Sequence, residues 1–260
     1  MERSAVHKYL LYAAGEVLLV VLGILIALQV NNWNENRREE DRLKTYLLNL
    51  QGALLDDIAS LDTTISVNKF RLHGIFYLLK HAGLNDSAFT DIRWVANPDE
   101  NDGIHKIWKG PYPDSLNRRF VIQSFCWLGR GFGGAAFNHS VINELYATGS
   151  FSNIPDPELK GKLGDYYRYL GQRLEGYAIE EHEEWANEVT RFLRDEYGIF
   201  TLDVSDMEDP ILLIRNRKDV ERHLRYLAFE VNYHCIWAAS ARNMAIELVQ
   251  LIGATEAAPD

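Results

Sequence analysis

Residues 9–30 read YLLYAAGEVLLVVLGILIALQV, and this stretch decides the architecture of the chain. It is 22 residues long, and Glu16 is its only formally charged side chain. At about 1.5 Å of rise per residue, a helix of this length covers the roughly 30 Å hydrocarbon core of a bilayer. A helix in a soluble core keeps a polar face, and residues 17–28 supply none. The sequence therefore predicts a single membrane-spanning helix.

A cleavable signal peptide is the alternative for an apolar stretch near the N-terminus. Its apolar region is shorter, at about 7–15 residues, and ends at a site with two small residues around one other. Here the stretch is longer, carries Glu16, and exits through ALQVNNW without a suitable site. We therefore expect the segment to stay in the protein as an anchor.

The basic residues around the apolar stretch leave both membrane orientations open. Two precede it and four follow it closely, at positions 3, 8, 37, 38, 42 and 44. That count favours a cytoplasmic domain, but long domains are translocated largely regardless of their charges. We favour a single-pass protein with its N-terminus inside and its domain outside.

The spanning segment has one face on which another helix can pack. Glu16, Gly23 and Ala27 lie on one stripe at helical spacing. Gly23 and Ala27 form a small-xxx-small pair, which allows close approach of a second helix. An ionisable group is costly in lipid, so Glu16 is expected either to face a partner across this stripe or to reach the headgroups. A proton or ion path is a third and weaker alternative. The partners expected are membrane lipid and either a second copy or another membrane protein.

Composition places the rest of the chain among globular proteins and limits its partners. Of 260 residues, 47% are hydrophobic and 25% are charged, which is ordinary for a folded domain. The net charge of −10 belongs entirely to the part after the apolar stretch. An acidic domain repels phosphate backbones, which argues against nucleic acid as a partner.

Cys126 and Cys235 form no motif, and two buried thiols are favoured over one disulfide.

Helical patterning continues beyond the apolar stretch and predicts an all-α fold. Leucine and isoleucine recur at helical spacing as far as Leu72, and Ala82-Gly83 is a stop signal. We expect a short tail (1–8), the transmembrane helix (9–30) and a stalk helix continuous with it. The predicted stalk covers residues 31–83.

Four further segments are expected to complete an up-down helical bundle. Residues 84–114, rich in Pro and Gly, predict a loop region, and the remaining bundle helices fall within 115–252, before a tail at 253–260. The first helix is predicted over 115–128, capped by Asp114 or Ser115, and the second over 138–148, ended by Gly149. Asp156 and Pro157 then start a helix to about Tyr197. Pro210 opens the last one, to about Ile252.

Motifs of known catalytic or cofactor sites are missing from the sequence. We find no HExxH, CxxC, Walker or GxSxG pattern. GRGFGG at Gly129–Gly134 lacks the Lys-Ser/Thr of a phosphate loop, and predicts a flexible connection. We therefore expect no cofactor and no enzymatic activity.

Acidic and histidine side chains on the last two predicted helices form the best candidate polar site. An antiparallel hairpin of these helices would bring Glu181 level with Glu230, Tyr177 with His234, and Glu188 with His223. Buried polar groups must be paired or bound to something. An internal hydrogen-bond network is the favoured interpretation, and a metal or small-ligand site, possibly of an enzyme, is the alternative. The weak metal candidates are Glu181, Glu188, His223, Glu230 and His234.

Two blocks of the sequence resemble a family of uncharacterised single-pass membrane proteins of Bacteroidota. The first is KYLLYAAGEVLLVVLGILIALQV followed by NNWNE, and the second is NELYATGSFSNIPDPELKGKLGDYYRYL at Asn143–Leu170. The resemblance implies membrane attachment in a bacterial envelope, and it carries over no activity or site residues. With the favoured orientation, this setting places the anchor in the inner membrane and the domain in the periplasm. The sequence thus predicts a membrane-anchored helical module with a binding, sensor-like or scaffolding role.

Overall fold

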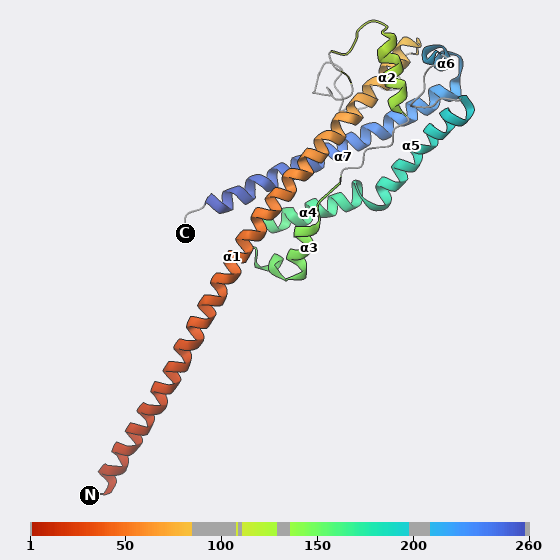
Figure 1. Ribbon diagram of the computed structural model, residues 1–260. Helices are drawn as coiled ribbons and strands as arrows, with labels where there is room; N and C mark the ends of the chain where they lie inside the picture. The colour runs from red at the N-terminus through yellow and green to blue at the C-terminus, as the bar shows by residue number, and fades with distance from the viewer. Residues whose placement is uncertain (1, 85–107, 109–110, 129–135, 198–208, 258–260) are drawn as a thin grey trace.

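The computed structural model is all-helical throughout the residues it describes (Figure 1). These are residues 2–84, 108, 111–128, 136–197 and 209–257; the side chains of 2–14, 177–179, 181–183, 185–186 and 255–257 are left out of the description. No strand occurs within these ranges. The predicted fold class is therefore confirmed: a long N-terminal helix leads into a helical bundle.

Helix α1 spans Glu2–His81 without interruption, so the predicted continuity of apolar segment and stalk is confirmed. It starts within the segment expected as a tail. Its end follows the predicted stop: the Gly83 N–H donates to Lys80 O (3.0 Å) and the Leu84 N–H to Leu79 O (3.1 Å). This pairing requires a left-handed residue, and Gly83 has φ of 78°. In Figure 1 the N-terminal half of α1 projects alone from the bundle.

Helix α2 spans Arg118–Leu128 and begins later than predicted. The expected caps, Asp114 and Ser115, are wrong, because Asn117 Oδ1 accepts the Phe120 N–H at 3.1 Å. Asn117 also donates its backbone N–H to the Tyr77 hydroxyl (2.7 Å), which fixes the start of α2 against α1. The Gly129–Gly134 connection lies outside the described residues, as does most of the 84–114 region.

The next elements are α3 (Ser140–Ala147), the 3₁₀ helix η2 (Ser150–Asn153) and α4 (Pro157–Arg173). Gly149, with φ of 74°, follows the end of α3 as expected, whereas η2 was not predicted. Asp156 caps α4 through a 2.8 Å bond from the Glu158 N–H, and Pro157 occupies the first turn. The predicted start of this helix is confirmed.

The single helix predicted from Pro157 to Tyr197 is wrong. The chain breaks after α4 and resumes as α5 (Gly176–Tyr197), at an angle to α4 in Figure 1. Leu174 and Glu175 both donate their N–H groups to Leu170 O, which closes α4. Gly176 follows in the left-handed region with φ of 63°. Leu174 is buried, so the break lets α4 and α5 pack on different parts of the bundle.

The single last helix is also wrong, because two helices replace it. Helix α6 (Pro210–Asn216) is capped by Asp209, and α7 (Lys218–Ala257) follows. Arg217 between them is extended, with φ of −124° and ψ of 101°. Neither Pro nor Gly stands at this break. Packing enforces it, since Ile211 and Ile214 of α6 are buried before α7 turns back along α1.

Helices α1 and α7 run antiparallel and form the spine of the bundle (Figure 1). Gln51 contacts Val249 O, Asp62 pairs with Arg242, and Asn68 contacts His234. Two apolar clusters lie along this spine. The one nearer the free end of α1 joins α1, α3, α4 and α7, and the distal one joins α1, α2, α5, α6 and α7. One face of α7 lies in both clusters and is fully buried, at Val220, Leu224, Leu227, Val231, Ala238 and Ala245.

Candidate functional site

The apolar segment of α1 is uncovered by the rest of the chain. Its large side chains between Val17 and Val30 are 47–74% exposed, whereas a core helix would bury them. One 18-residue window within the described helix has a mean hydropathy of 1.8 and no burial. Helix α1 is thus long and apolar enough to cross a membrane. Soluble core helices and signal sequences also meet this criterion of length and composition. This segment differs from a core helix because none of the window is buried.

The predicted helix-association residues lie on this uncovered segment. Glu16, Gly23 and Ala27 are all exposed. A Cβ added to Gly23 would meet nothing within 4 Å. The geometry leaves this face open for lipid or for another helix. The role of these three residues in helix association stays a prediction.

A buried carboxylate, Asp57, ties α1 to the segments around α3 and α4. Its side chain is fully buried. Oδ2 accepts the Tyr166 hydroxyl at 2.9 Å, and Oδ1 accepts the Asn138 N–H at 3.1 Å. Burial raises the pKa of Asp57 above its usual range, and the two hydrogen bonds only partly oppose this shift. Burial, together with the Asp57 charge, also raises the pKa of Tyr166.

A second polar pair lies beside Asp57. His139 Nε2 lies 2.7 Å from Glu175 Oε1, so the imidazole donates its N–H to the carboxylate. The Tyr167 ring lies 5.4 Å from that of His139, and its hydroxyl is buried without a hydrogen-bond partner among the described residues. These contacts hold the start of α3 and the break before α5 against α4. The arrangement therefore connects three segments of the chain.

A buried polar layer separates the two apolar clusters further along α1. Asn68 Nδ2 donates to Thr64 O (3.1 Å) and contacts His234 Nδ1 at 2.9 Å. Arg71 donates to Asn68 Oδ1 (3.3 Å) and to Leu128 O (3.0 Å), and burial lowers its pKa to about 10. The fully buried Cys235 follows His234, and burial raises the pKa of its thiol to about 12. A layer of this kind fixes the register of α1 against α7, because sliding either helix along the other would leave buried polar groups without hydrogen-bond partners.

Four of the predicted candidates have described side chains, namely Glu188, His223, Glu230 and His234, and they form no metal-binding group among the described residues. His234 is buried against Asn68 of α1, while Glu230 is buried on α7 and Glu188 is exposed on α5. His223 stacks on Phe192 at 3.9 Å and contacts Asp219 O through Nδ1 (2.7 Å). The predicted pairing of Glu188 with His223 is therefore wrong by one helical turn. The side chains of Tyr177 and Glu181 lie outside the described residues.

The described residues hold no group of three or more His, Cys, Asp or Glu side chains placed to bind a metal ion. Cys126 and Cys235 are free thiols, so the disulfide alternative is not realised. Asp57, Asn68 and Arg71 are buried on α1 together with Thr64, and none of them was among the predicted site residues. Asp57 had a readable signal, since it continues the spacing of Leu50, Leu54 and Leu61 on one helix face.

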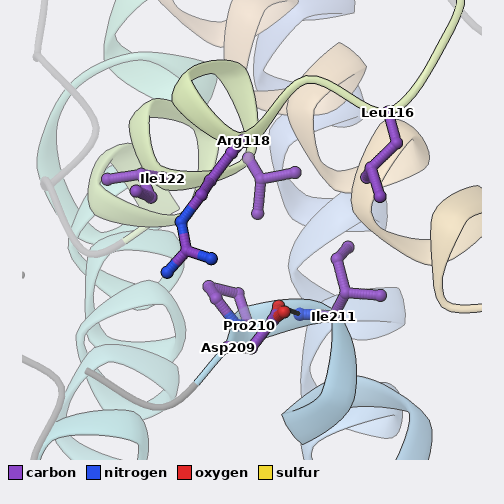
Figure 2. A pocket seen from close by; sticks show the side chains of 7 residues that line it. Leu116, Arg118, Ile122, Asp209, Pro210 and Ile211 are labelled. Atoms are coloured by element: carbon purple, nitrogen blue, oxygen red, sulfur yellow. Dashed lines mark hydrogen bonds between the residues drawn. The ribbon is translucent and has the colours of Figure 1, made fainter.

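An open groove of about 110 Å³ lies at the far end of the bundle, between the starts of α2 and α6. Figure 2 shows Arg118 extending from α2 toward Asp209 and Pro210, with Ile122 next to it and Leu116 on the other side of the groove, above Ile211. Asp209 is engaged in capping, because its Oδ1 accepts the Ile211 N–H at 2.9 Å. The groove is therefore mainly apolar, with one guanidinium over it.

Comparison with known proteins finds a match only for the N-terminal part of the chain. Residues 16–95 match a family model described as "Family of unknown function (DUF6090)". The match begins at Glu16 and includes most of the apolar segment and the stalk. No curated protein matches the chain, and no solved structure does. The similarity agrees with an uncharacterised domain and assigns no activity.

Proposed function

We propose that this protein is a single-pass membrane protein in which α1 is both the anchor and the first helix of the bundle. The observation that carries the proposal is the continuity of α1. The same helix that exposes Val17–Val30 buries Leu50, Leu54 and Leu61 completely in the core. An exposed apolar surface of that length is costly in water and favourable in lipid.

The bundle in this proposal is a binding, sensor-like or scaffolding module and not an enzyme. Its buried carboxylate, arginine and histidine are used to join helices, as the contacts of Asp57 and Asn68 illustrate. Helix α1 has no break between the anchor and the bundle, so a displacement of the bundle is passed along it to the bilayer. This property suits a sensor or a scaffold that holds a partner at a fixed height.

We further propose a bacterial envelope setting, in the inner membrane with the bundle in the periplasm. The resemblance of the N-terminal signature and its exit NNWNE to uncharacterised membrane proteins of Bacteroidota supports this setting. The match to a family of unknown function covers this stretch from Glu16 onward. Translocation of a long domain independently of its flanking charges is compatible with this orientation.

Membrane flotation of the full chain tests the proposal. We expect the intact chain, verified by mass spectrometry to retain its first 30 residues, to float with vesicles and to resist carbonate extraction. Recovery of that intact chain in the soluble fraction without detergent would contradict anchoring. Recovery of a shorter chain starting near Asn31 would show cleavage instead.

Sidedness is read out separately, with a cysteine at an exposed bundle position. Ser152→Cys in a Cys126→Ser background places the thiol on an exposed residue, while Cys235 stays buried. A membrane-impermeant maleimide is expected to label it in intact spheroplasts. Labelling only after lysis would place the bundle in the cytoplasm and leave anchoring intact.

A further inference from the structure

The stalk part of α1 carries a second uncovered stripe beyond the apolar segment. Leu48 is 53% exposed and Leu55 is 52% exposed, and Gly52 and Ala59 between and beyond them are also exposed. Large and small residues alternate along this stripe. A Cβ added to Gly52 would meet nothing within 4 Å. Two half-exposed leucines one heptad apart on a stalk are the pattern of a helix-pairing seam.

This stripe continues the face that carries Gly23 and Ala27. Residues seven apart lie about 20° from one another on a straight helix. Steps of seven from Ala27 pass through Asn34 and Asp41 to Leu48 and Leu55. Since α1 is unbroken, the membrane segment and the stalk present one face. We call Gly23, Ala27, Leu48, Gly52, Leu55 and Ala59 together the α1 stripe.

The stalk half of the α1 stripe points away from the bundle. Leu50, Leu54 and Leu61 face the core and are fully buried, about half a turn from Leu48 and Gly52. The elements beside the stalk approach it from other directions. Tyr46 reaches α3 through Glu144 (3.0 Å), and Gln51 reaches the end of α7 through Val249 O (3.3 Å). A second helix therefore reaches the α1 stripe without displacing any described element.

The same face is used for helix packing higher up α1. Continuing past Ala59 at helical spacing reaches Phe70 and Tyr77, which are buried. Phe120 of α2 packs on both rings, at 5.8 and 4.7 Å between centroids. The α1 stripe thus lies on the same face of α1 that packs against α2 further toward the C-terminus.

We propose that two copies of the chain pair in parallel through the α1 stripe. The inference rests on the proposed function, because insertion in one membrane gives both copies the same direction and the same depth. An identical helix then presents its leucines and small residues at matching levels. Arg38 lies about 4.5 Å along the axis from Asp41, which brings the carboxylate of one copy within reach of the guanidinium of the other.

Disulfide mapping of the full chain in vesicles tests the pairing. The background is Cys126→Ser, with the buried Cys235 kept. Leu48→Cys and Leu55→Cys are compared with Lys44→Cys and Asn49→Cys, two exposed positions on the flanks of the α1 stripe. A disulfide needs Cα atoms within about 7 Å, which only facing positions reach in a two-helix pair. We expect several-fold more cross-linked dimer for the first two variants.

A second variant tests the pairing without added cysteines. Leu48→Lys with Leu55→Lys changes two side chains that are already half exposed, so folding of each copy is expected to persist. Single-molecule photobleaching in vesicles is expected to shift from two steps to one. Persistence of two-step bleaching, or equal cross-linking at all four cysteine positions, would overturn the proposal. So would cross-linking of Leu48→Cys to a different protein while the purified chain stays monomeric.

The pairing and the anchoring fail in different ways. Flotation of the same vesicles reports anchoring alone. A chain that floats but gives no preference for Leu48→Cys and Leu55→Cys refutes the pairing and leaves the anchor intact. A chain that does not float refutes the anchor, and the same four cysteine variants then report the pairing in the soluble fraction.

Discussion

The Tyr166 hydroxyl of α4 donates a 2.9 Å hydrogen bond to Oδ2 of Asp57, a carboxylate buried on α1 109 residues earlier in the chain. Both side chains are fully buried. Asp57 also accepts the Asn138 N–H, so one carboxylate joins α1, the start of α3 and α4. This contact holds the start of α3 and α4 against the stalk part of α1, in the half of the bundle nearer the free end of that helix.

Removing the hydroxyl in Tyr166→Phe is expected to lower the free energy of unfolding by about 1.5 kcal/mol, because a buried acceptor loses its donor. Chemical denaturation of the full chain in detergent measures the change. Tyr169→Phe, on the same helix and without a hydrogen bond from its hydroxyl in the described structure, is the matched control. A double-mutant cycle with Asp57→Ala should give a coupling of about 1 kcal/mol. Additive effects would show that the two side chains do not interact.

Helices α1 and α2 approach each other closely at Gly74. A Cβ built there would lie 2.9 Å from the Ser124 Cβ, closer than normal contact. Gly74→Ala is therefore expected to destabilise the protein by about 1–3 kcal/mol, although alanine favours helix. Thermal unfolding measures the loss. Ser124→Gly should restore part of it in the double variant. No loss in Gly74→Ala alone would mean that α2 is not held this close.

Most of this fold could be predicted from local sequence, and the exceptions have definite causes. The continuous α1, its Gly83 stop and the Asp156-Pro157 start depend on neighbouring residues alone. The break at Arg217 is imposed by the burial of Ile211 and Ile214. Since neither Pro nor Gly stands there, local sequence gives no sign of it. Leu174–Gly176 did contain a glycine, but the apolar spacing on either side hid the change of direction.

The polar contacts were harder to predict than the helices. His234 contacts Asn68 on α1, 166 residues away, a contact that the sequence did not predict. The side chain of Tyr177, its expected partner, lies outside the described residues. The sequence shows which α7 residues share a face, but it does not show which helix covers that face. Unexpected breaks also shift the register, which moved Phe192 rather than Glu188 onto His223.

The break between α4 and α5 depends on a left-handed glycine. Gly176 has φ of 63°, which a side chain makes unfavourable. Gly176→Ala is expected to lower the unfolding free energy by about 1 kcal/mol. Gly171→Ala is the matched control, because Gly171 is helical with open space at its Cβ, and it should stabilise by about 0.5–1 kcal/mol. Equal effects of the two variants would contradict the observed break.

Stability is also expected to fall on acidification because of His73. Its ring stacks on Tyr112 at 3.8 Å, and burial, followed by the nearby charge of Lys80, lowers its pKa to about 4. The unfolded chain binds a proton at this side chain near pH 6.5, whereas the folded chain does so only near pH 4. Folding therefore excludes about one proton between these values, and stability is lost as the pH falls through this window. The expected loss is about 2–3 kcal/mol.

His73→Phe keeps a ring against Tyr112 but removes the titrating group. Unfolding free energies of both proteins, measured from pH 7 to pH 4.5 in detergent, should diverge, with the variant losing less stability on acidification. Asp57 changes the comparison little, because its raised pKa acts in the opposite direction and is present in both proteins. Parallel pH profiles would show that His73 is protonated in the folded state or is solvated more than its stacking implies. A flatter profile for His73→Phe but not for the exposed control Lys80→Gln would assign the effect to the buried ring rather than to the neighbouring charge.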